Sequence, residues 1–197
     1  MTTPTIEFWN WFAENKDHFR TFDADRQELI DEISQRLKAI DERLTWEISP
    51  EHEGMCGLVI SADGRRAVFP IVRAVVAAAP ELPGWQVRAF RQRVDLGQFT
   101  LEFAGREITT GDFYFQLSRQ GSSLDLAYYL PGLTAENRDV LMHISFILLD
   151  MALGEEDVAL GIRYIDHHPV PADPAAEGLH PLTELPAAFD ALRSSSR

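Results

Sequence analysis

The sequence predicts an α+β protein with a largely antiparallel sheet, on three observations. The first forty or so residues carry apolar side chains at helical spacing, and several later segments alternate apolar and polar residues with a period of two. Helical segments flank runs of strands instead of alternating with single strands, and no glycine-rich dinucleotide turn is present, which disfavours a Rossmann-type fold. We therefore expect an N-terminal helical hairpin followed by a sheet with two helices packed on one face.

Two helices open the expected fold. Thr3 and Pro4 are typical of an N-cap and a first helical residue, and apolar side chains continue to Phe19. Asp25 and Glu28 resemble a capping box for a second helix. The apolar stripe of that helix consists of Ile30, Ile33, Leu37, Ile40 and Leu44. The stripe covers only about two heptads, which favours packing on the domain over a dimeric coiled coil.

Segments in which apolar and polar residues alternate predict the strands and a sheet with one solvated face. The expected strands lie at 44–48, 58–60, 85–91, 99–103, 113–117, 124–130 and 160–164. Helices are expected near 70–76, from an N-cap at Thr134 to about Ala152, and near 187–192. In the expected strands between 99 and 130, the residues that alternate with the apolar ones are mostly polar and include Tyr114 and Tyr129. One face of the sheet should therefore be apolar and the other exposed to solvent.

The domain organisation is expected to be a single α+β domain over residues 1–197. It comprises the helical hairpin (1–43), a sheet-and-helix core (44–168) and a proline-rich tail with a short helix (169–197). The predicted strands contain no proline and few lysines to guard the sheet edges. The tail is available to cover one of these edges.

Composition narrows the function classes. Eighteen basic and 31 acidic residues give a net charge of −13. This charge disfavours binding to nucleic acid and favours binding to basic partners. The single cysteine, Cys56, excludes an intramolecular disulfide and a Cys-x-x-Cys site. No signal-peptide core and no membrane span are recognisable, so we expect a cytoplasmic acidic protein without a cofactor.

Two histidine–carboxylate pairs are the candidate chemical groups. His143 and Asp150 are seven residues apart on one face of the apolar helix, where they could transfer a proton or form a satisfied contact at the rim of the core. Asp166 and His168 share one side of an extended segment and could hold a metal together, whereas His167 points to the opposite side. Two ligands do not close a metal site, and no metal is expected.

Aromatic residues are the candidate partner contacts. Trp9 and Trp11 point about 200° apart on a helix, so one of them is expected to be partly exposed. Tyr114 and Tyr129 on the solvated sheet face are further candidates. We expect a monomer or a weak homodimer, with the dimer slightly favoured and the exposed tryptophan near the contact.

Several stretches taken together resemble a family of uncharacterised bacterial proteins grouped under a domain of unknown function. They are Phe8–Phe12, Ile60–Gly64, Phe69-Pro70, Ala78–Trp85, Ala89–Arg91, Leu130–Gly132, Leu148–Asp150, Leu153–Val158 and Pro181–Pro186. The likeness covers nearly the whole chain. It implies kinship and a shared single-domain fold, and it brings no activity, cofactor or site residue with it.

The sequence carries no nucleophile elbow, phosphate loop or zinc-protease motif. We therefore interpret the chain as a non-catalytic cytoplasmic binding or regulatory module that acts through protein contacts. The alternative is a hydrolytic or acid–base enzyme with an unrecognised site built from His143, Asp150, Asp166 or His168.

Overall fold

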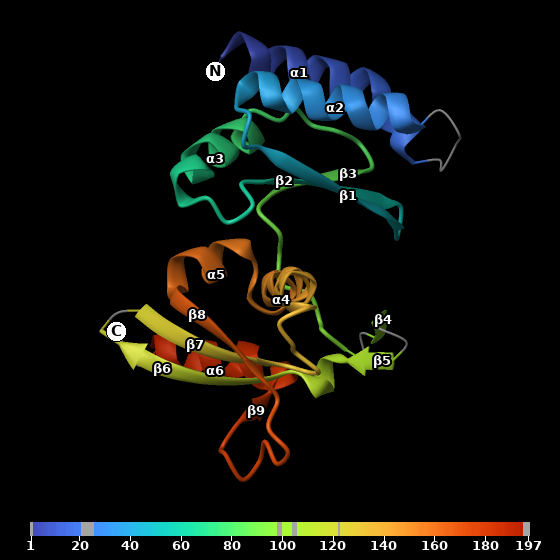
Figure 1. The fold of residues 1–197 in the computed structure, drawn as a ribbon. Helices are drawn as coiled ribbons and strands as arrows, with labels where there is room; N and C mark the ends of the chain where they lie inside the picture. The colour runs from blue at the N-terminus through green and yellow to red at the C-terminus, as the bar shows by residue number, and fades with distance from the viewer. Residues whose placement is uncertain (1, 21–25, 98–99, 104–105, 122, 195–197) are drawn as a thin grey trace. The chain divides into compact units, whose positions relative to one another are not determined.

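The computed structural model has an α+β fold and describes residues 2–20, 26–97, 100–103, 106–121 and 123–194 (Figure 1). Asp25 of the expected capping box and residue 99 of the expected strand 99–103 lie outside these residues. The chain divides into two compact units, 1–91 and 92–197, and each has its own sheet and helices. The boundary falls inside the range 44–168 that the sequence analysis treats as one core.

The N-terminal unit combines three helices with a three-stranded sheet. The helices are α1 (Thr3–Asn15), α2 (Arg26–Ile40) and α3 (Phe69–Ala77), with short 3-10 turns at Lys16–Phe19 and Arg66–Val68. The sheet has the order β1 (Thr45–His52), β2 (Met55–Ser61) and β3 (Trp85–Ala89). The β1–β2 pair is antiparallel, whereas β2–β3 is parallel.

Aromatic and aliphatic side chains join these helices to one face of the sheet. Helices α1 and α2 lie side by side as the expected hairpin (Figure 1). The indole of Trp9 in α1 donates to the Val75 carbonyl of α3 at 2.9 Å, and that of Trp46 in β1 bonds to Ser34 of α2 at 3.0 Å. The core between them consists of fully buried residues that include Phe8, Phe12, Ile33, Leu37, Leu58 and Ile60.

The C-terminal unit contains a four-stranded sheet of order β8-β7-β6-β9. Its strands are β6 (Tyr114–Gln120), β7 (Ser123–Leu130), β8 (Ile162–Pro169) and β9 (His180–Pro181), and its helices are α4 (Arg138–Leu153), α5 (Glu155–Gly161) and α6 (Leu185–Ser194). Strands β4 (Thr100–Phe103) and β5 (Arg106–Thr109) form a separate two-stranded sheet. The β7–β8 pair is parallel, and the β6 pairs are antiparallel.

Strand β7 separates an apolar from a solvated face, as its alternation predicts. Leu124, Leu126, Tyr128 and Leu130 are buried, and the residues between them are half-buried. The buried side shares one core with α4 and α6, through residues that include Leu141, Leu148, Leu149, Leu185 and Phe189. Helices α4 and α5 lie on one side of the sheet (Figure 1). Among the residues that the structure describes, every helix is too short or too polar to cross a membrane.

Several details differ from the sequence analysis, which predicted neither β5 nor β9. The strands form three sheets rather than one, and two strand pairs are parallel. Helix α5 was not predicted, because Gly154 and the acidic residues after it are also typical of a solvated turn. Gly154 has a φ of +81° and joins α4 directly to α5, whose first residue Glu155 is buried. Helix α4 begins after Asn137, not at Thr134, because the Asn137 side chain accepts the Thr134 backbone N–H at 2.8 Å.

The sheet edges also differ from the expectation. The observed strands are longer than the predicted ones, and Pro50, Pro169 and Pro181 lie in the end strands β1, β8 and β9. The prediction that no proline guards an edge is therefore wrong for these strands. The tail, which was available to cover an edge, does so, because β9 pairs with β6 at Tyr114 and Phe115.

Candidate functional site

The outward side of helix α4 exposes large apolar side chains. Val140, Phe146 and Ile147 are 53%, 44% and 47% exposed. The helical repeat places them on one side with His143, which is exposed, and Asp150, which is half-buried. We call this set the α4 face. It includes the predicted pair His143 and Asp150, which lie seven residues apart along the helix.

The inward side of α4 accounts for only part of its apolar residues. Leu141, Ser145, Leu148, Leu149 and Ala152 are buried against the sheet core. A helix with one side buried normally carries charged and polar residues on the other side. Helix α4 departs from this pattern, because Val140 and Ile147 are large apolar residues on its outward side. Phe146 lies at the border of the two sides, since it is 44% exposed and its ring also contacts that of His167.

Asp166 and His168 lie together on the solvated face of the four-stranded sheet. Nε2 of His168 is 3.2 Å from Oδ2 of Asp166, and the two side chains are 40% and 49% exposed. The ring of His168 also lies 5.2 Å from that of Tyr129, its register partner in β7. Tyr129 is in turn the register partner of Tyr114 in β6. Three ring-bearing residues from three strands thus form one row across the sheet, with Asp166 beside its end.

This row has the groups for a hydrogen-bonding contact but falls short of a recognisable catalytic or metal site. A carboxylate beside an imidazole can orient it and support proton transfer. In the described part of the chain, no group of three or more His, Cys, Asp or Glu side chains could hold a metal ion. Tyr114 and Tyr129 are half-buried, and they stay predicted contact residues.

His167 lies on the opposite side of β8 in a buried hydrogen-bonded group. Its Nε2 is 3.0 Å from Oγ of Ser145, and its ring contacts those of Phe146 and Tyr128 at 5.7 and 6.1 Å. Burial lowers the pKa of His167, with a smaller contribution from the positive charge of Arg138. Burial also raises the pKa of Tyr128, whose hydroxyl has no hydrogen-bond partner within the described structure. The sequence signal for His167 was the alternation along the strand, which placed it on the opposite side from Asp166 and His168; its register partner, Tyr128, comes from the structure.

Trp9 and Trp11 are both buried, with exposures of 3% and 8%, so the prediction that one of them is exposed is wrong. Helix α1 is covered on two sides. Trp9 reaches α3 through Val75, whereas Trp11 packs edge-on to Phe19 and lies under the guanidinium of Arg36, 4.9 Å from its ring centre. Side chains that point about 200° apart can therefore both be buried. The expected dimer contact therefore has no exposed tryptophan to lie near, and the oligomeric state stays a prediction.

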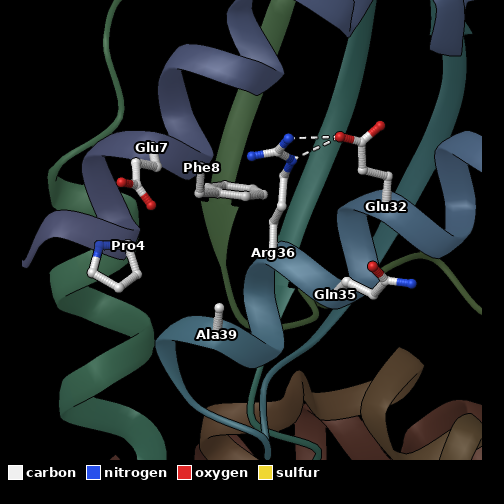
Figure 2. A pocket seen from close by; sticks show the side chains of 7 residues that line it. All are labelled: Pro4, Glu7, Phe8, Glu32, Gln35, Arg36 and Ala39. Carbon is white, nitrogen blue, oxygen red and sulfur yellow. Dashed lines mark hydrogen bonds and ion pairs between the residues drawn. The ribbon is translucent and has the colours of Figure 1, made fainter.

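A pocket of about 240 Å³ lies between α1 and α2, with Phe8 and Ala39 in its wall (Figure 2). Its basic residue, Arg36, is held by Glu32 through two bonds to Oε1, at 3.1 Å from Nε and 2.6 Å from Nη2. Because Arg36 is paired within its own helix and stacked on Trp11, we do not assign this pocket a ligand.

Comparison with known proteins finds no relative: no family model, curated protein or solved structure matches the chain significantly. The resemblance to a bacterial family of unknown function stays a prediction.

Proposed function

We propose that this protein is a non-catalytic binding module whose C-terminal unit recognises another protein through the α4 face. The observation that carries the proposal is the exposure of Val140, Phe146 and Ile147 on one side of a single helix. Contiguous apolar surface on a folded unit is a mark of protein contact, because leaving it in water costs free energy that a partner surface recovers.

The carboxylates on the side of α4 that carries the α4 face indicate the chemistry of the partner. The carboxylates of Asp139 and Asp150 fall on the same side of the helix as His143, and the whole chain has a net charge of −13. An apolar surface bordered by lysine or arginine would match both the apolar residues and the carboxylates. A cytoplasmic partner of this kind fits the expected location of the protein.

Site-specific crosslinking tests this proposal. A photoreactive amino acid at Ile147 should give a discrete adduct with one other protein in lysate of the source organism, and Val140→Lys should abolish that adduct. The same amino acid at Lys38, an exposed position on α2 of the other unit, is the control. Adducts that are the same from both positions, or an adduct with twice the mass of the chain, would contradict the proposal.

The row of Tyr114, Tyr129 and His168 supports the alternative function, an acid–base enzyme, through the contact of His168 with Asp166. In that case His168 would be the base and Asp166 would orient it. A turnover assay over ester, amide and phosphoester substrates tests this alternative, which requires an activity that is lost in His168→Gln and retained in Ile147→Lys.

A further inference from the structure

Strand β3 differs from the other end strands of the two larger sheets. β1, β8 and β9 contain Pro50, Pro169 and Pro181, and the register of the β1–β2 and β7–β8 pairs shifts once along each pair. Prolines and irregular pairing are common ways to prevent an edge from accepting another strand. β3 contains no proline, and its register with β2 runs without a shift from Trp85 to Ala89.

The backbone of β3 presents Val87 to the outer edge. The Gly84 carbonyl accepts the Cys56 N–H at 2.9 Å, and the Phe90 N–H donates to the Ile60 carbonyl at 2.8 Å. Backbone groups along a strand point alternately to its two sides, so the even-numbered residues of β3 bond to β2. The N–H and C=O of Val87 therefore point away from the sheet, where an added strand could bond to both.

An apolar groove lies beside this edge. It has a volume of about 440 Å³, and Val87, Val76 of α3, Met55 of β2 and Leu82 contribute to its wall. Met55 is 43% exposed, so its side chain is accessible to a bound segment. Glu81 is the one charged residue among the ten that line the groove. A strand added at β3 would alternate its side chains, so every second one would face the helix side of the sheet, where Val76 and the groove lie.

We propose that the outer edge of β3 binds an extended peptide segment of another protein, which carries a large apolar side chain for the groove and a lysine or arginine for Glu81. Strand addition of this kind takes its affinity from main-chain hydrogen bonds and its selectivity from pockets for alternate side chains. This site lies in the N-terminal unit and does not depend on the α4 face.

A second copy of the chain fits this edge less well. Antiparallel pairing of two β3 strands would centre on Val87, because Trp85 and Ala89 lie two residues to either side. The side chain offered to the groove would then be a valine, which fills little of 440 Å³. Both copies would also carry a net charge of −13, whereas a basic peptide is attracted.

Peptide selection tests the proposal with short random peptides displayed on phage as the probe and the full chain as the target. We expect enriched peptides to share alternating apolar residues and a basic neighbour. N-methylation at every second peptide residue should weaken binding by about tenfold, because each methyl removes a main-chain bond. The intervening positions should tolerate the methyl group. The proposal would be overturned if the effect of N-methylation did not alternate along the peptide, or if the selection enriched no sequence.

Three variants of the protein complete the test. Val87→Pro removes the outward N–H but leaves the even-numbered bonds to β2, and it should weaken the peptide by about tenfold. Val87→Thr keeps the N–H and is the matched control. Val76→Lys blocks the groove without changing the strand, so it should also weaken binding, even if Val87→Pro fails to fold. Wild-type binding in Val76→Lys, or a wild-type dimer that Val87→Pro dissociates, would show the proposal to be wrong.

Discussion

Ser145 Oγ and His167 Nε2 lie 3.0 Å apart and join helix α4 to strand β8 inside the C-terminal unit. Ser145 also donates to the Met142 carbonyl at 2.7 Å, and a hydroxyl has a single hydrogen, so Oγ accepts from the Nε2–H of His167. Both residues are buried, at 0% and 7% exposure. This bond satisfies an imidazole that the surrounding core favours in its neutral form.

The stability of the C-terminal unit should fall in mild acid because of His167. Burial lowers its pKa in the folded state, so the unfolded chain binds a proton more readily. The stabilisation is fully present above the unfolded-state pKa of about 6.5 and is lost as the pH falls below it. Urea unfolding followed by circular dichroism should show the advantage of wild type over His167→Gln shrinking from about pH 7.5 to about pH 5.5. An advantage that grows in acid would contradict this expectation.

Ser145→Ala should destabilise the same unit at neutral pH. The substitution leaves the Nε2–H of His167 buried without its acceptor, at a cost of about 1–3 kcal/mol. Urea unfolding measures this loss. The double variant Ser145→Ala/His167→Leu should recover part of it, because the unsatisfied donor is then removed as well; a double variant less stable than the sum of the single changes would be inconsistent with the bond.

Adjacent residues on α4 should differ strongly in how much their substitution destabilises the unit. Ile147 is 47% exposed, so Ile147→Lys should change the free energy of unfolding by less than about 0.5 kcal/mol and improve solubility. Leu148 is 1% exposed, and Leu148→Ala should cost about 2–5 kcal/mol. Denaturant unfolding of both variants checks the orientation of the helix. Similar losses for the two would mean that Ile147 is also packed within the isolated chain.

Gly161 at the end of α5 should not tolerate alanine. A Cβ there would lie 2.5 Å from Cζ of Phe189, which is fully buried in α6. We expect Gly161→Ala to cost about 1–3 kcal/mol by overpacking. Phe189→Leu should relieve part of this cost in the double variant, which a double-mutant cycle measures. The control is Gly111→Ala, where a Cβ meets an ordinary contact of 3.5 Å to Thr109 Oγ1.

Arg93 should hold helix α6 in place. Its guanidinium bonds Asp190 of α6 at 2.8 and 2.9 Å, Asp157 of α5 at 2.6 Å and the Leu153 carbonyl at 2.8 Å. The bond from Arg93 also lowers the pKa of Asp190, so this contribution is present above an unfolded-state pKa of about 3.9 and is lost as the pH falls further. Arg93→Ala should cost about 1 kcal/mol and speed hydrogen exchange in residues 185–194.

Arg163→Ala is the control for Arg93. Arg163 pairs with Asp125 on the exposed face of the sheet and contacts no residue of α6 in the bonds described. Its removal should leave exchange in residues 185–194 unchanged. Equal effects of the two variants would show that loss of a positive charge, not loss of the Arg93 bonds, loosens α6.

Local patterns predicted individual elements well. Alternation in β7 gives alternate burial, and Pro70 falls in the first turn of α3 as expected. The parallel partners of β2 and β7 could not be predicted, because pairing depends on residues far away in the sequence. The same holds for Trp11, whose burial depends on Arg36 of another helix.

The candidate site, too, could be predicted only in part from the sequence. Because side chains alternate along a strand, Asp166 and His168 were expected on one side of β8, and the structure brings them into contact. Sequence reasoning missed the α4 face, because only His143 and Asp150 of this apolar helix were considered as candidate groups, and its apolar residues were not assigned to an exposed side. The distinction between core and exposed apolar residues depends on how many sides of the helix are covered, which a single helical segment does not encode.

The boundary at Arg91 also divides the intrinsic fluorophores of the protein. All four tryptophans, Trp9, Trp11, Trp46 and Trp85, belong to the N-terminal unit, and all four tyrosines, Tyr114, Tyr128, Tyr129 and Tyr164, belong to the C-terminal unit. Selective excitation of tryptophan therefore reports on the first unit alone. Energy transfer from tyrosine to tryptophan reports on the distance between the units. The unlabelled chain thus carries its own donor–acceptor pair, with which the unfolding of each unit and their approach on binding a partner can be followed separately.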